Sequence, residues 1–70
     1  MKPFETLQGS AEETAEIMIT RGLSVMTIPD HNNLALVVDD TPEADSRKKE
    51  LGTVITEIEK NGKKYLICAH

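Results

Sequence analysis

The pattern of hydrophobic positions predicts a β-hairpin in the last third of the chain, residues 53–69. Two β-branched or apolar runs, 54–58 and 65–68, flank the dipeptide Asn61-Gly62. Asn-Gly between such runs is the strongest short-range hairpin signal, because a type I′ turn needs positive φ at both central residues. A two-residue turn at this place fixes which residues face each other. The predicted cross-strand pairs are Lys60–Lys63, Glu59–Lys64, Ile58–Tyr65, Thr56–Ile67 and Ile55–Cys68.

A helical period of apolar residues predicts a helix from Ser10 to Arg21. Its apolar positions recur at spacings of three and four residues. Ser10 and Glu13 form a capping box at its start, and Gly22 suits a left-handed stop at its end. The face expected to lie on a sheet consists of Ala11, Ala15, Met18 and Ile19, with Ile17 at its margin.

Two more apolar runs predict a second hairpin over 23–39. In 23–29 the apolar residues lie on both faces of an extended strand, and 34–38 is continuously apolar, which is typical of a strand buried on both faces. Between them, 29–33 has the composition of a turn. We therefore expect a second strand pair with a longer loop than the first.

The charged connector 39–52 carries weaker signals. Thr41-Pro42 fits an N-cap followed by proline at the first helical position, and Gly52 fits a C-terminal stop. The apolar residues that could pack are Ala44 and Leu51, so burial adds little to a helix here. We predict a short surface helix over 43–51, with a charged loop as the alternative. Two acid–base pairs at i,i+4 spacing would support the helix: Glu43–Arg47 and Asp45–Lys49.

Together these elements predict a single small α+β domain over 1–70, in the order α-β-β-α-β-β. Its two hairpins would form a four-stranded antiparallel sheet, with one or two short helices packed on one face. Residues 1–9 are predicted to be an arm, either flexible or an edge strand, in which Phe4 and Leu7 cover the core. The two halves repeat the same plan, with Gly22 and Gly52 30 residues apart.

Composition narrows the class of protein. A core of this size is small, so dimerisation is a natural source of added stability. The single cysteine, Cys68, excludes an internal disulfide. No run approaches the ~20 apolar residues of a membrane span, and the N-terminus lacks the apolar segment of a signal peptide. We expect a cytoplasmic protein that does not associate with membranes.

Residue types that carry chemistry are few. His31 lies in the predicted turn, where we expect a solvated side chain. Cys68 and His70 share one strand face, but two ligands are too few for a structural zinc site. The acidic run after residue 38 has neither the spacing nor the glycine of a calcium loop. We therefore expect no catalytic residue, no metal and no cofactor, in a protein that is not an enzyme.

The net charge of −4 and the sequence pI of about 5.0 favour a protein partner over a phosphate backbone. The leading hypothesis is a non-enzymatic protein–protein interaction module, an inhibitor or regulator of the kind that phages and mobile elements direct at host proteins. It would act through an acidic surface, or through an exposed strand edge that pairs with a partner or a second copy. The acidic residues expected to contact the partner are Glu12, Glu13, Glu16, Asp39, Asp40, Glu43 and Asp45.

The alternative is an accessory protein that contacts nucleic acid through a local basic patch. The passage from helix to hairpin over 21–38, followed by a charged segment, resembles antitoxins of the prevent-host-death type. That resemblance implies a regulatory protein of the antitoxin kind. The basic patch would consist of Arg47, Lys48, Lys49, Lys60, Lys63 and Lys64.

Overall fold

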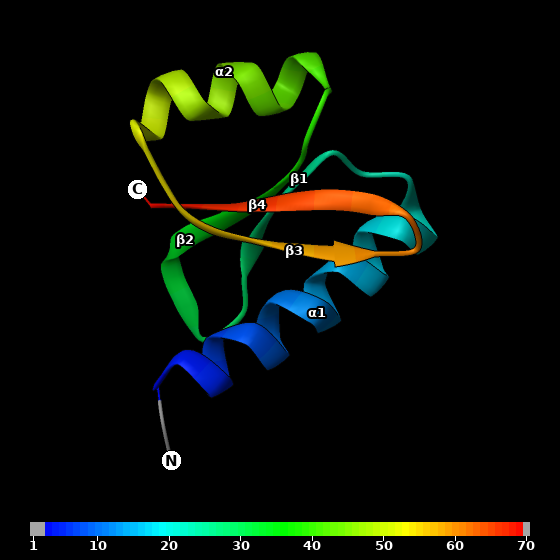
Figure 1. The fold of residues 1–70 in the computed structure, drawn as a ribbon, viewed down its shortest axis with the longest axis vertical. Coiled ribbons are helices and arrows are strands. Elements are labelled where there is room, and N and C mark those ends of the chain that lie inside the picture. The colour runs from blue at the N-terminus through cyan, green and yellow to red at the C-terminus, as the bar shows by residue number, and fades with distance from the viewer. Residues whose placement is uncertain (1–2, 70) are drawn as a thin grey trace.

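The computed structural model describes residues 3–69 and confirms the predicted α+β fold. Its four strands form one antiparallel sheet in the order β1-β2-β4-β3, so that β2 and β4 are central and β1 and β3 are the edges (Figure 1). The elements are α1 (Pro3–Arg21), β1 (Val25–Ile28), β2 (His31–Val38), α2 (Pro42–Leu51), β3 (Thr53–Lys60) and β4 (Lys63–Ala69).

The two helices cover opposite faces of the sheet (Figure 1), which corrects the expectation that they pack on one face. Leu36 and Ile67 belong to the core beneath α1, whereas Val37, Leu66 and Cys68 belong to the core beneath α2. Successive residues of a strand point to opposite faces. The continuous apolar runs of both central strands therefore need cover on both sides, and one helix supplies it on each.

This arrangement limits the likeness between the two halves of the chain to the order of their elements. Leu36 and Leu66 are 30 residues apart, yet they lie on opposite faces of the sheet. A two-fold axis normal to the sheet would interchange the two hairpins and keep both helices on one face. Because the helices lie on opposite faces, no such axis relates the halves.

Helix α1 begins at Pro3, so the predicted start at Ser10 and the predicted arm over 1–9 are wrong for residues 3–9. Proline is well suited to the first helical turn, since its missing N–H would lack a helical partner there. Leu7 lies one turn before Ala11 and packs against the same core, so the apolar face continues through the predicted cap. The carbonyl of Ser10 accepts a hydrogen bond from Thr14 Oγ1 at 2.8 Å, as an interior helical residue can. The Phe4 side chain lies outside the described part of the structure.

The C-terminal end of α1 follows the prediction. Gly22 adopts a φ of 66°, and the N–H of Leu23 donates to the carbonyl of Met18 at 3.0 Å, which closes the helix. The buried face includes Thr14, a residue that the apolar pattern does not reveal, while Ile19 is only partly buried. The hydrogen bond to Ser10 satisfies the Thr14 hydroxyl, which permits its burial.

The β3–β4 hairpin confirms the predicted turn and four of the five predicted pairs. Asn61 and Gly62 have φ values of 53° and 75°, as a type I′ turn requires. The register shifts between Val54 and Thr56, so Cys68 faces Val54 rather than Ile55. A bulge at this point adds one residue to β3, and the turn chemistry contains no information about it.

The β1–β2 hairpin has a tighter turn than expected. Strand β2 begins at His31, so the turn consists of Pro29 and Asp30, with a φ of 64° at Asp30. The extra residues that composition assigned to the loop lie in β2, where the pairing with β1 is irregular between Thr27 and Ile28.

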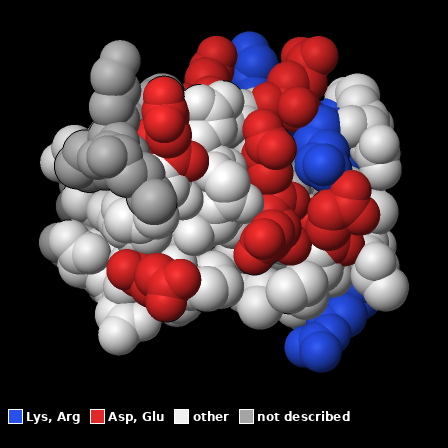
Figure 2. All heavy atoms as spheres, turned by 90° about the horizontal axis from the view of Figure 1, so that it is seen from below, with Lys and Arg blue, Asp and Glu red and all other residues white. Residues whose placement is uncertain are grey.

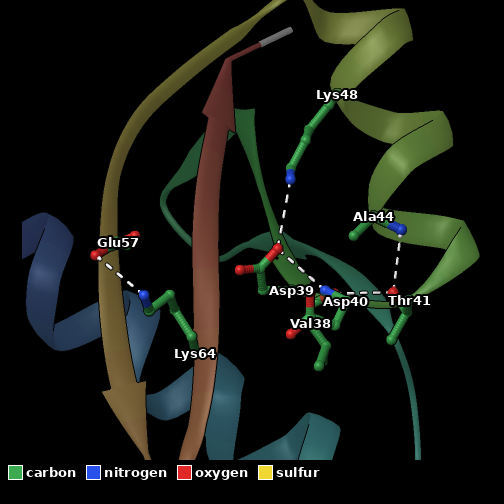
Figure 3. A network of polar contacts seen from close by, with 8 residues as sticks. All are labelled: Val38, Asp39, Asp40, Thr41, Ala44, Lys48, Glu57 and Lys64. Carbon is green, nitrogen blue, oxygen red and sulfur yellow. Dashed lines mark hydrogen bonds and ion pairs between the residues drawn. The ribbon is translucent and has the colours of Figure 1, made fainter.

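The connector forms the predicted helix, α2. Thr41 Oγ1 accepts from the N–H of Ala44 at 3.1 Å and donates to the carbonyl of Val38 at 2.8 Å (Figure 3). Gly52, at φ 76°, ends the helix. Ala44 is fully buried against the sheet, and the side chain of Leu51 lies outside the described part. The ion pairs differ from those predicted: the observed partners are Arg47–Glu50 at 2.7 Å and Lys48–Asp39 at 3.4 Å.

Candidate functional site

The acidic residues proposed from the sequence lie on two sides of the sheet. Glu12, Glu13 and Glu16 are exposed on α1, and Figure 2 shows that acidic side chains predominate on the face that this helix forms. The other four lie around the start of α2, beyond the opposite face of the sheet: Asp39, Asp40, Glu43 and Asp45. The seven residues therefore form two surfaces instead of one.

The carboxylate and the backbone N–H of Asp39 both have hydrogen-bond partners within the fold. Its Oδ1 accepts from Lys48 Nζ at 3.4 Å and from the N–H of Asp40 at 3.0 Å (Figure 3). The N–H of Asp39 donates to the carbonyl of Lys64 on β4 at 2.9 Å. These contacts fix the entry into α2, so they explain this carboxylate without a partner protein.

The basic residues are also divided by the sheet. Lys60 lies on the α1 side, where its Nζ is 3.0 Å from Glu16 Oε1. Lys64 lies on the α2 side, with its Nζ 3.8 Å from Glu57 Oε1, and Lys48 contacts Asp39 on that same side (Figure 3). Each of these cations already faces a carboxylate, which reduces the positive potential available to a phosphate backbone.

The residues with reactive side chains do not come together. Cys68 is fully buried beneath α2; burial raises the pKa of its thiol, and the nearby Lys48 and Arg47 act in the opposite direction. His70, its proposed neighbour, lies outside the described residues. Within residues 3–69, no cluster of three His, Cys, Asp or Glu side chains is placed to hold a metal ion.

His31 differs from the solvated turn residue that the sequence predicts. It is the first residue of β2 and is half-buried. Its Nε2 atom is buried and has no hydrogen-bond partner among the described residues.

The surface with the clearest capacity for binding is the open edge of β3. This strand is terminal in the sheet and has eight residues, most of them exposed, whereas the other edge strand, β1, has four. Val54 and Ile55 expose 45% and 49% of their surface on this edge, among the largest apolar exposures in the described chain. The unpaired N–H and C=O groups of a long edge strand form a template for another strand, and exposed apolar residues beside them favour that contact.

A small hollow lies beside this edge, between the first half of α1 and β3. Leu7 and Gln8 of α1 form one wall, and Ile67 of β4 contributes to the lining. The rest of the lining comes from β3: Thr56, Glu57 and Ile58. A strand added to β3 would carry side chains past this hollow.

Sequence reasoning named an exposed strand edge without identifying the strand. The signal that points to β3 is the pair Val54-Ile55, two neighbouring apolar residues that both remain exposed beside the register shift.

Comparison with protein-family models, with curated proteins and with solved structures gives no significant match. Within residues 3–69, neither helix is long and apolar enough to cross a membrane.

Proposed function

We propose that this protein is a non-enzymatic interaction module that binds another protein by adding a strand of that partner to the open edge of β3. The observation that supports the proposal is an unpaired, eight-residue edge strand with exposed apolar side chains at its beginning. In this mode of recognition the main chain contributes hydrogen bonds, and alternate side chains contribute specificity. A module of this kind acts as an inhibitor or regulator, because it covers a surface of its partner and transforms nothing.

The pairing pattern identifies the groups that a partner strand would use. The carbonyl of Lys64 accepts a hydrogen bond from the N–H of Asp39, so it points to the β2 side of β4. Successive residues in an antiparallel sheet turn their backbone groups to alternate sides. Glu59 and Glu57, which face Lys64 and Leu66, therefore turn their N–H and C=O groups away from β4, toward the open edge.

The experiment compares Glu57→Pro with Glu57→Ala. Proline at 57 removes an N–H that points to the open edge and leaves the pairing with β4 intact, which edge strands tolerate. Tagged forms of both variants and of the unsubstituted protein are used to capture partners from a lysate of the source cells, with and without nuclease. Circular dichroism and thermal unfolding establish that each variant is folded.

We expect a stoichiometric protein partner that survives nuclease and is lost with Glu57→Pro. Glu57→Ala keeps the main-chain N–H and loses only a side-chain pair, so it should still capture the partner, with affinity reduced by about 0.2–1 kcal/mol at most. A partner retained by folded Glu57→Pro would contradict strand addition at this edge. Loss of every partner on nuclease treatment would favour contact with nucleic acid through the lysines instead.

A further inference from the structure

We infer that the strand accepted by β3 has a basic–apolar–basic sequence, with Lys or Arg opposite Glu57 and Glu59 and an apolar residue opposite Ile58. This inference rests on the proposed function, because it specifies the partner of the same edge. Glu57, Ile58 and Glu59 are consecutive residues of β3, and both glutamates are exposed.

The two carboxylates share one face of the sheet. Glu57 pairs with Leu66, which lies in the core beneath α2, and Glu59 pairs with Lys64. Residues directly opposite in an antiparallel pair have their Cβ atoms about 5 Å apart on the same face, where opposite charges attract and like charges repel. On the inner side Lys64 is the cation near both carboxylates, with its Nζ 3.8 Å from Glu57 Oε1. On the open side, the positions opposite Glu57 and Glu59 belong to the incoming strand. Cations at those positions would place positive charge on both sides of the two carboxylates.

The residue of the incoming strand that lies between its two cations is opposite Ile58 and therefore points to the other face of the sheet. Ile58 lies on the α1 face and is buried with Tyr65 in the main core. The hollow lined by Leu7, Thr56 and Ile58 lies next to this position. An apolar side chain opposite Ile58 would cover the mouth of that hollow and the apolar residues around it, whereas a charged one would lose part of its hydration there.

A second copy of this chain fits the edge poorly. An antiparallel pairing of β3 with itself centred on Ile58 places Glu57 of each copy opposite Glu59 of the other. Four carboxylates would then lie on one face of the joined sheet, and like charges directly opposite each other are destabilising. The edge therefore disfavours its own copy in this register and favours a basic strand.

The test uses two defined peptides, acetylated and amidated at their ends: Thr-Val-Lys-Val-Lys-Thr and its charge-reversed form Thr-Val-Glu-Val-Glu-Thr. Each is titrated into the nitrogen-15-labelled full chain at low salt, and amide shifts and amide hydrogen exchange are recorded by NMR. The double variant Glu57→Lys with Glu59→Lys is titrated in the same way, and its amide spectrum establishes that it is folded.

We expect the basic peptide to bind about tenfold more tightly than the acidic one and to slow exchange of the Glu57 and Glu59 amides. The double variant should reverse the preference. Equal binding of both peptides, binding away from β3, or no binding of either would overturn the inference about partner chemistry. If that happens while Glu57→Pro still abolishes capture from the lysate, the proposed function stands and the inference alone fails; if capture is unaffected by proline, the proposed function fails too.

Discussion

Ile58 lies directly opposite Tyr65 across β3 and β4, and both side chains are buried beneath α1. The pair joins the edge strand to the core beneath α1, and each of its residues is three positions from the turn that sets the register. It therefore connects the stability of the fold with the position of the open edge.

Ile58→Ala should destabilise the protein by about 2–5 kcal/mol, because it removes buried methyl groups and leaves a cavity beside Tyr65. The matched control is Ile55→Ala, at an exposed residue of the same strand, for which we expect a change within about 0.5 kcal/mol. Urea unfolding followed by circular dichroism measures both. Similar losses for the two variants would contradict the burial pattern of β3.

Gly62→Ala should destabilise the protein by about 1–2 kcal/mol, since Gly62 has a φ of 75° in the hairpin turn, where a Cβ is strained. Gly9→Ala should instead stabilise it by about 0.5–1 kcal/mol, because Gly9 is exposed inside α1 and a Cβ there meets no atom within 4 Å. Thermal unfolding of the two variants reports the opposite signs. A loss of stability in Gly9→Ala would argue against a helix that begins at Pro3.

Thr41→Ala should cost about 1 kcal/mol, because the N–H of Ala44 loses its side-chain acceptor at the start of α2. Ser46→Ala is the control, as Ser46 is exposed within the same helix and alanine has the higher helix propensity. Denaturant titration should show a loss for the first variant and no loss for the second. A neutral Thr41→Ala would show that this cap does not hold the helix.

The stability of the fold should fall at alkaline pH. Burial raises the pKa of both the Cys68 thiol and the Tyr65 phenol, so each group favours its neutral form in the folded protein. A group whose folded pKa is raised contributes stability that is complete below its unfolded pKa and is lost as pH rises through the folded value. For the thiol this loss begins near its ordinary pKa of 9.0.

The measurement is the free energy of unfolding in urea from pH 7 to pH 10.5. Cys68→Ala lowers stability at every pH by creating a cavity. It should also flatten the part of the alkaline decline that the thiol causes, which begins at a lower pH than the part caused by the Tyr65 phenol. If the slopes of the variant and the unsubstituted protein coincide throughout, the thiol does not contribute to the pH dependence.

Local chemistry is what made parts of this fold predictable. Asn61-Gly62 determines the turn and the nearest cross-strand pairs through the φ values it requires, and Thr41 with Gly52 bounds α2 through capping. The predicted start of α1 is wrong because Ser10 and Glu13 have the residue types of a cap inside a helix whose real beginning, at Pro3, carries an equally local signal.

The features that escaped prediction depend on contacts distant in sequence. The face that α2 covers follows from the two-sided burial of β2 and β4 together, and the open edge follows from the strand order. The bulge that exposes Ile55 adjusts β3 to β4 several residues from the turn. Consequently the sequence suggested an exposed edge as a means of binding, and its place on β3 came from the assembled sheet.

The separation of the core into two layers has a kinetic consequence. Among the described side chains, the layer beneath α2 consists of Val37, Ala44, Leu66 and Cys68, with Val25 at its margin, and has fewer members than the layer beneath α1. Small cooperative units open more often than the whole molecule, so α2 should lift from the sheet while α1 and the strands remain folded. Because Cys68 is buried in this smaller layer, the rate at which a thiol reagent labels it reports how often the helix detaches.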